Sequence, residues 1–316
     1  MSRNLFPLSL AASLIGGTAL ADVPRVAADI APVHSLVARV MQGVGEPALI
    51  VAPGASPHEY SLRPSEAAAL QEAEVIFWIS PDLTPWLEDA IGTLAGDAAV
   101  TELLGAEGTT ELPFRDGALF EAHEHGEEAH AEEDDHAHDH DDDHAHGAHD
   151  PHAWLSPDNG AAWLNAIAGA LSAADPDNAD AYRANAADGR AELDALRAEI
   201  DGVLTPVRGR NFIVFHDAYQ YFEHAFDFPA SGAISLSDAS DPSPARIAEI
   251  QARVAEQGVT CVLSEPQFDP RVVAAVMEGS AARAGVLDPL GSDLQPGPDL
   301  YPQMLRNLAA ALAGCL

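Results

Sequence analysis

The chain has 316 residues, enough for two domains of ordinary size, and it carries 50 acidic side chains against 15 basic ones. The formal net charge of −35 makes nucleic acid and anionic lipid poor partners and cations good ones. Beyond the N-terminal apolar run, no segment of the sequence is long and apolar enough to span a bilayer.

The N-terminus has the pattern of an export signal. Arg3 supplies a positive end, residues 5–19 form a mostly apolar core, and Ala-Leu-Ala at 19–21 fits the small-x-small cleavage pattern. We expect residues 1–21 to be removed after Ala21. A membrane anchor is disfavoured because the apolar run is short and ends in a good cleavage site. The mature product is expected to be soluble and periplasmic.

The first half of the mature chain alternates between predicted strands and helices. Short apolar or β-branched runs predict strands at 25–31, 48–51 and 75–79. Helical spacing predicts helices at 33–41, 64–73 and 85–94. This alternation predicts a mostly parallel sheet flanked by helices, in an N-terminal α/β lobe that covers residues 22–157.

A histidine-rich acidic segment at 121–150 interrupts this lobe. Its thirty residues hold nine histidines, thirteen acidic side chains and no large apolar residue. Nothing there can offset the entropy of ordering the backbone, so we predict a mobile loop. Imidazole beside carboxylate suits divalent transition metals, zinc above all, whereas an acidic spacer for solubility needs no histidine. The candidate auxiliary ligands are His123, His125, His130, His136, His138, His140, His144, His146 and His149.

The second half begins with alanine-rich helical sequence. One helix is predicted to end near 173, and a second runs from 176 to 204, about 42 Å at the usual helical rise. A helix of that length is better explained as a rigid strut between two lobes than as a crossover within one, so residues 158–207 form a separate helical region.

Strand and helix patterns then alternate again. Strands are predicted at 211–215, 233–236, 259–263 and 285–287, and helices at 244–256, 271–283 and 299–313. These elements predict a C-terminal α/β lobe over 208–316. The predicted fold is therefore two α/β lobes joined by one long helix, with a cleft between the lobes.

Metal-type side chains follow several of the predicted strands. His58, His216 and Asp288 each come just after a strand, and His152 lies where the acidic segment meets the helical region. Ligands of open α/β sheets bind beyond the carboxyl ends of the strands, so the cleft could gather these residues around one ion. Three imidazoles with a carboxylate or a water make a tetrahedral site of the kind that zinc accepts. Glu59 and water are the alternatives to Asp288 in the fourth position.

The chain has two cysteines, Cys261 and Cys315. Export favours a disulfide between them, and two separate buried thiols are the alternative. In the chain-entropy model such a bond contributes roughly 4 kcal/mol.

Several short motifs occur in order along the chain: GASPHEY at 54–60 with LRPS at 62–65, DPH at 150–152 with WLSP at 154–157, HDAY at 216–219, EPQF at 265–268 and LDPLG at 287–291. With these motifs the chain resembles the periplasmic zinc-binding proteins of bacterial high-affinity zinc ABC importers, within the cluster of zinc and manganese receptors. The resemblance covers nearly all of the mature chain.

This resemblance implies a ligand set. His58, His152 and His216 are implied as zinc ligands, and histidine at 216 favours zinc because manganese-type relatives usually carry a carboxylate there. Asp288 stands where related receptors supply a carboxylate, although some zinc members use water or another acid. One departure is Pro57, which replaces the glutamate that some zinc members carry before the first histidine.

The resemblance also implies a function and partners. The expected protein is a monomer that captures Zn(II) outside the inner membrane and delivers it to the permease of an ABC transporter. A periplasmic zinc chaperone is a further expected partner, and the histidine-rich segment is expected to collect or sense zinc weakly. A disulfide between Cys261 and Cys315 is implied as well.

Two other classes of protein compete with this interpretation. A secreted zinc hydrolase also uses three protein ligands and a water, but the sequence has no H-E-x-x-H and Glu59 would be an unsupported general base. A passive periplasmic metal buffer would bind zinc through the histidine-rich segment alone. We therefore expect a transport protein and not an enzyme.

Overall fold

The computed structural model describes residues 23–115, 117, 149–235 and 242–316. Two four-stranded sheets form two lobes, with strand orders β2-β1-β3-β4 and β6-β5-β7-β8. The strands within each sheet pair in parallel. These sheets and their covering helices confirm the predicted fold class. The predicted export signal and the histidines at 123–146 lie outside the described residues.

The N-terminal lobe comprises β1 (Val26–Ala28), α1 (Ala31–Val40), β2 (Ala48–Leu49), α2 (Pro64–Glu72), β3 (Val75–Trp78), α3 (Pro85–Leu94) and β4 (Ala99–Glu102). The sequence patterns did not predict β4. This strand lies at the edge of the sheet and three of its four residues are exposed, so it has no apolar run.

The C-terminal lobe comprises β5 (Phe212–His216), α6 (Gln220–Phe226), β6 (Ala233–Ser235), α7 (Pro244–Glu256), β7 (Cys261–Ser264), α8 (Pro270–Val276) and β8 (Arg283–Val286). The helix predicted at 271–283 is wrong in its second half. Helix α8 ends at Val276, and Gly279 takes a left-handed conformation with φ of 77°. The chain thus turns early enough for β8 to begin at Arg283.

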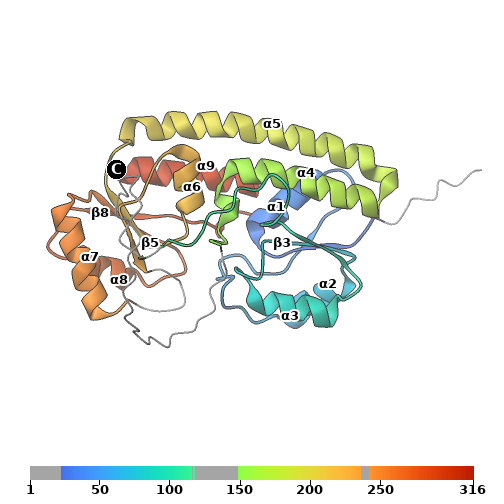
Figure 1. The fold of residues 1–316 in the computed structure, drawn as a ribbon, viewed down its shortest axis with the longest axis horizontal. Helices are drawn as coiled ribbons and strands as arrows, with labels where there is room; N and C mark the ends of the chain where they lie inside the picture. The colour runs from blue at the N-terminus through green and yellow to red at the C-terminus, as the bar shows by residue number, and fades with distance from the viewer. Residues whose placement is uncertain (1–22, 116, 118–148, 236–241) are drawn as a thin grey trace, which may run out of the picture.

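A layer of long helices joins the two lobes. It consists of α4 (Pro157–Ala174), α5 (Ala179–Leu204) and α9 (Leu300–Cys315). Helix α5 has 26 residues and runs along the length of the molecule, above both lobes (Figure 1). Buried side chains of both sheets and of these helices belong to one continuous hydrophobic cluster. Within the described residues, no helix meets the length and apolarity needed to cross a membrane.

Two smaller hydrophobic clusters cover the outer faces of the sheets. In the N-terminal lobe, α2 and α3 pack on the outer face through side chains such as Leu70 and Leu87. In the C-terminal lobe, α7 and α8 do the same through Ile250 and Val273. Each sheet is therefore covered on both faces, as expected for a parallel sheet.

Proline begins five of the helices, where its missing N–H and fixed φ suit the first helical turn. These prolines are Pro64, Pro85, Pro157, Pro244 and Pro270. At α4 the preceding Ser156 also caps the helix, because its hydroxyl accepts a hydrogen bond from the backbone N–H of Asn159. This cap fixes the start of α4 at Pro157, five residues after His152.

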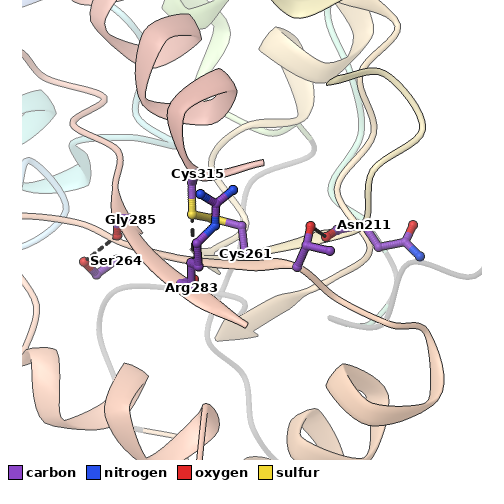
Figure 2. The surroundings of a disulfide bond; sticks show 7 residues. Asn211, Cys261, Ser264, Arg283, Gly285 and Cys315 are labelled. Atoms are coloured by element: carbon purple, nitrogen blue, oxygen red, sulfur yellow. Dashed lines mark hydrogen bonds between the residues drawn. A yellow bond between two sulfur atoms is a disulfide. The ribbon is translucent and has the colours of Figure 1, made fainter. Parts of the chain in front are cut away.

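The predicted disulfide is confirmed. Cys261 in β7 is bonded to Cys315 at the end of α9, with a Cα–Cα distance of 5.8 Å (Figure 2). The bond ties the helical layer covalently to the strand that leads into Glu265. Beside it, the Ser264 hydroxyl donates to the carbonyl of Gly285 in the neighbouring strand at 3.1 Å.

Candidate metal centre

Three histidines from distant parts of the chain converge between the lobes. His58 follows β2, His152 precedes α4, and His216 is the last residue of β5. Nε2 of His152 lies 3.3 Å from Nε2 of His58 and 3.4 Å from Nε2 of His216. A tetrahedral zinc ion bound at 2.0–2.1 Å holds its ligand atoms about 3.3–3.4 Å apart. Both distances therefore suit one shared zinc ion.

The third pair of histidines closes the group. One ligand atom from each of the three residues lies within 4.8 Å of the other two. Across the part of the chain that the structure describes, this is the one group of three or more metal-type side chains with such spacing. His152 and His216 are buried, and His58 is partly exposed. The ion would be reached from the side of His58.

Buried carboxylates orient two of the imidazole rings. Asp150 Oδ1 accepts from Nδ1 of His152 at 2.7 Å, and Glu265 Oε1 accepts from Nδ1 of His216 at 2.5 Å. A proton on Nδ1 leaves the Nε2 lone pair free for a metal, so each carboxylate selects the binding tautomer. Gln267 extends this arrangement by donating to Glu265 Oε2 at 2.8 Å.

Asp150 corrects the predicted boundary of the mobile segment. The sequence placed it at the end of the loop at 121–150, but only 2% of its surface is exposed. It also accepts from the backbone N–H of His152 at 3.0 Å. The D-x-H spacing was the available signal, and it was obscured by the acidic run before it.

The N-terminal lobe supports the turn that carries His58. Nε1 of Trp86 donates to the carbonyl of Pro57 at 2.8 Å. The Tyr60 hydroxyl donates to Glu66 Oε1 at 2.7 Å, and its ring packs against Trp86. These contacts hold a turn-rich segment in place without a helix or strand.

The predicted fourth ligands do not belong to the three-histidine group. The Asp288 carboxylate accepts hydrogen bonds from the backbone N–H groups of Leu290, Gly291 and Ser292 and from the Ser292 hydroxyl. Three of these bonds go to Oδ1 and one to Oδ2, and a ligand role for Asp288 stays a prediction. Glu59 is exposed.

The space at the histidines is small. A cavity of about 10 Å³ is lined by Pro57, His58, His152, Trp154, His216, Gln267, Pro289 and Leu290. This volume suits about one water molecule or one ion.

Buried acids lie around the site, and burial disfavours their charged form. Burial raises the pKa of Asp150 to about 7, although the backbone N–H of His152 and the charge of Arg115 act in the opposite direction. Burial likewise raises the pKa of Asp217 to about 7, partly offset by Arg115. A divalent cation bound nearby would favour the ionised form of these acids. Sequence reasoning missed Arg115 and Asp217, because their contact spans 102 residues.

One residue of the predicted auxiliary set is described. His149 pairs with Pro113 in an isolated antiparallel bridge, and its Nδ1 lies 3.6 Å from Glu111 Oε2. The residue at the end of the histidine-rich segment, His149, is therefore paired with Pro113, which precedes that segment in the chain.

The fold and the site define a two-lobed protein whose interlobe centre suits one divalent metal ion. The family model described as zinc-uptake complex component A, periplasmic, matches residues 26–315. The chain belongs to this family.

Individual relatives are similar to this chain over almost its full length. The chain is 46% identical to the high-affinity zinc uptake system protein ZnuA of Brucella abortus, over 99% of both chains. It is 44% identical to the protein of the same name from Paracoccus denitrificans, over 98% of both chains. A crystal structure of ZnuA matches with a TM-score of 0.73 at 26% identity, covering 93% of this chain and 99% of that one.

Proposed function

We propose that this protein is the periplasmic solute-binding component of a high-affinity zinc importer. It binds one Zn(II) through Nε2 of His58, His152 and His216 and delivers it to an ABC permease of the inner membrane. The observation that carries the proposal is the distance of His152 Nε2 from Nε2 of His58 and of His216, 3.3 and 3.4 Å, which matches the ligand spacing around a tetrahedral zinc ion. The names of the relatives, all zinc uptake proteins, support zinc as the cargo.

A water molecule completes the coordination in this proposal. The cavity holds about one water-sized group, and the Asp288 carboxylate is already satisfied by the turn at 288–292. Asp288 then shapes the turn beside the ion instead of binding it. Glu59 is given no role at the metal in this proposal, because its side chain is exposed and does not belong to the three-histidine group.

Several further expectations accompany the main proposal. The precursor is cleaved after Ala21, and the mature protein is a periplasmic monomer. The segment at 121–149 collects zinc weakly for the interlobe site, and a periplasmic zinc chaperone is a second donor.

The cavity size and the chemistry around it disfavour the competing classes. A hydrolase needs room for its substrate beside the zinc-bound water, and about 10 Å³ does not supply it. A passive buffer needs no buried carboxylates to orient its ligands, whereas Asp150 and Glu265 are each 2% exposed and hydrogen-bonded to a ligand ring.

Zinc affinity of single variants tests the proposal. The changes His58→Ala, His152→Ala and His216→Ala should each weaken tight binding at least about 100-fold, measured by competition with a zinc chelator. The exposed His224 provides the matched control, and His224→Ala should bind zinc as the unchanged protein does. A variant lacking 121–149 should keep one tightly bound ion. Wild-type affinity in all three ligand variants would contradict the interlobe site.

A further inference from the structure

Arg115 joins two buried carboxylates close to the metal centre. Its Nε and Nη2 donate to the two oxygens of Asp217 at 3.1 and 2.6 Å. Its Nη1 and Nη2 donate to the two oxygens of Glu223 at 2.9 and 3.1 Å. Both acid side chains are nearly buried, at 8% and 7% exposure. The guanidinium thus makes two bidentate contacts, a geometry that the planar fork of arginine permits and an ammonium does not.

One of these acids continues directly from a predicted zinc ligand. Asp217 follows His216, so the first contact of Arg115 fixes the backbone that leaves β5. Glu223 lies in α6, and its Oε2 also accepts from the backbone N–H of Ala230. Arg115 therefore binds both the residue directly after His216 and helix α6, which follows it in the chain.

The segment that carries Arg115 is itself paired with the segment that carries His152. The backbone N–H of Asp150 donates to the carbonyl of Leu112 at 2.9 Å, and Pro113 pairs with His149. The Tyr221 hydroxyl accepts from the N–H of Leu112 and donates to the carbonyl of Asp150. The segments at 111–115 and 149–152 are thus joined by one antiparallel bridge and by the hydrogen bonds at Leu112 and Asp150; together they are called the ribbon here.

We infer that Arg115 is a positioning residue for the metal site: it docks the ribbon at 111–115 and 149–152 on α6 and so fixes His152 relative to His216. The inference rests on the proposed zinc-binding function. Arg115 does not touch the ion, and it acts through Asp217 on one side and through the ribbon on the other. Without it, two nearly buried carboxylates lose their shared cation, and the ribbon keeps only its hydrogen bonds to Tyr221 and Gln220 of α6.

The sign of the effect separates positioning from simple electrostatics. A cation near the site repels zinc, so removing its charge alone would tighten binding. Loss of positioning has the opposite effect, because the spacing of the Nε2 atoms is no longer fixed. The two roles therefore predict changes of zinc affinity in opposite directions.

The test compares two variants. Arg115→Met removes both the positive charge and the bidentate hydrogen bonds of the guanidinium, whereas Arg115→Lys keeps only the charge. We expect Arg115→Met to weaken zinc binding about 10- to 100-fold, as changes around metal ligands commonly do, with Arg115→Lys in between. Zinc should also leave both variants faster. The absorption spectrum of bound Co(II) should change in both, which a purely structural role far from the site would not cause.

The matched control is Arg306→Met. Arg306 binds Glu199 through Nε at 3.0 Å, between α9 and α5, and its loss should leave zinc affinity and the Co(II) spectrum unchanged. Affinity equal to or tighter than wild type in Arg115→Met would overturn the inference, as would wild-type behaviour of Arg115→Lys. Where Arg115→Met does not fold, Arg115→Lys decides alone. A wild-type protein that binds no zinc would instead refute the proposed function.

Discussion

The ring of each buried ligand histidine is held at the nitrogen that faces away from the metal position. Asp150 holds His152 from two residues away, whereas Glu265 holds His216 across 49 residues. The histidines themselves could be predicted because short motifs and strand ends mark them. Glu265 and Arg115 could not be assigned roles in advance, because their partners are brought near only by the completed fold.

Asp29 is a further buried acid, and it lies outside the ligand network. It is fully buried after β1 and accepts from the backbone N–H groups of Ile30 at 2.7 Å and Ile79 at 2.8 Å. Burial raises its pKa from 3.8 to about 7, although these two hydrogen bonds lower it. Between about pH 4 and 7 the folded protein therefore keeps a proton that the unfolded chain has lost. Stability must fall as pH rises through this window.

The change Asp29→Asn isolates this effect. The unfolding free energy of wild type minus that of the variant should decrease from pH 4 to pH 7, by at most about 4 kcal/mol. Urea unfolding of the zinc-free proteins at a series of pH values measures the difference. Asp89→Asn, at an exposed position in α3, should show no such trend. A difference that is flat or rises with pH would contradict the role of Asp29.

At the scale of elements, the strands with buried residues were predictable, whereas the exposed edge strand β4 was missed and the start of β8 was predicted two residues late. The strand β3 has four buried residues and was predicted from its apolar run. In β4 and β8 the burial patterns are mostly exposed, so the hydrophobic signal is weak. Helix α8 was predicted too long because its alanine-rich continuation favours a helix, whereas Gly279 turns the chain.

Helix α4 contains two glycines in opposite surroundings. A Cβ added at Gly160 would lie 2.5 Å from the hydroxyl and 2.9 Å from ring carbons of Tyr301. The Tyr301 side chain is buried, and its hydroxyl lies within hydrogen-bond distance of the carbonyls of Trp154 and Ser156. At Gly169, among the described residues, nothing lies within 4 Å of the added atom.

We therefore expect Gly160→Ala to destabilise the protein by about 1–3 kcal/mol, because Tyr301 must move. The same change at Gly169 should stabilise it by about 0.5–1 kcal/mol, through the higher helix propensity of alanine. Thermal or urea unfolding compares the two. Equal effects of both changes would show that the contact with Tyr301 carries no energetic weight.

At the scale of the molecule, the two lobes share a helical layer and a continuous core. Side chains of both sheets contribute to the same hydrophobic cluster as α4, α5 and α9. The disulfide adds a covalent link from α9 to the C-terminal sheet. The sequence predicted the strut from its length alone, but the shared core appears only when the helices are placed on both sheets.

Zinc binding should therefore leave the overall shape unchanged. A hinge motion would have to break the shared core, so release needs a local displacement of a ligand-bearing segment. We expect the same radius of gyration with and without zinc by small-angle X-ray scattering. His216→Ala in the presence of zinc is the control for effects of free metal. A clear contraction of the wild-type protein on zinc binding would contradict a rigid strut.

The pairing of Pro113 with His149 has a consequence for how the protein can vary. Because this pairing brings the two flanking segments together, a change in the length of the sequence at 118–148 need not disturb their contact. In a flexible chain each doubling of loop length costs only about 0.6 kcal/mol. The same junction is a suitable site for inserting another protein domain. A fluorescent domain inserted there would begin beside Arg115 and end three residues before His152, so it would be attached next to a segment that carries a proposed zinc ligand.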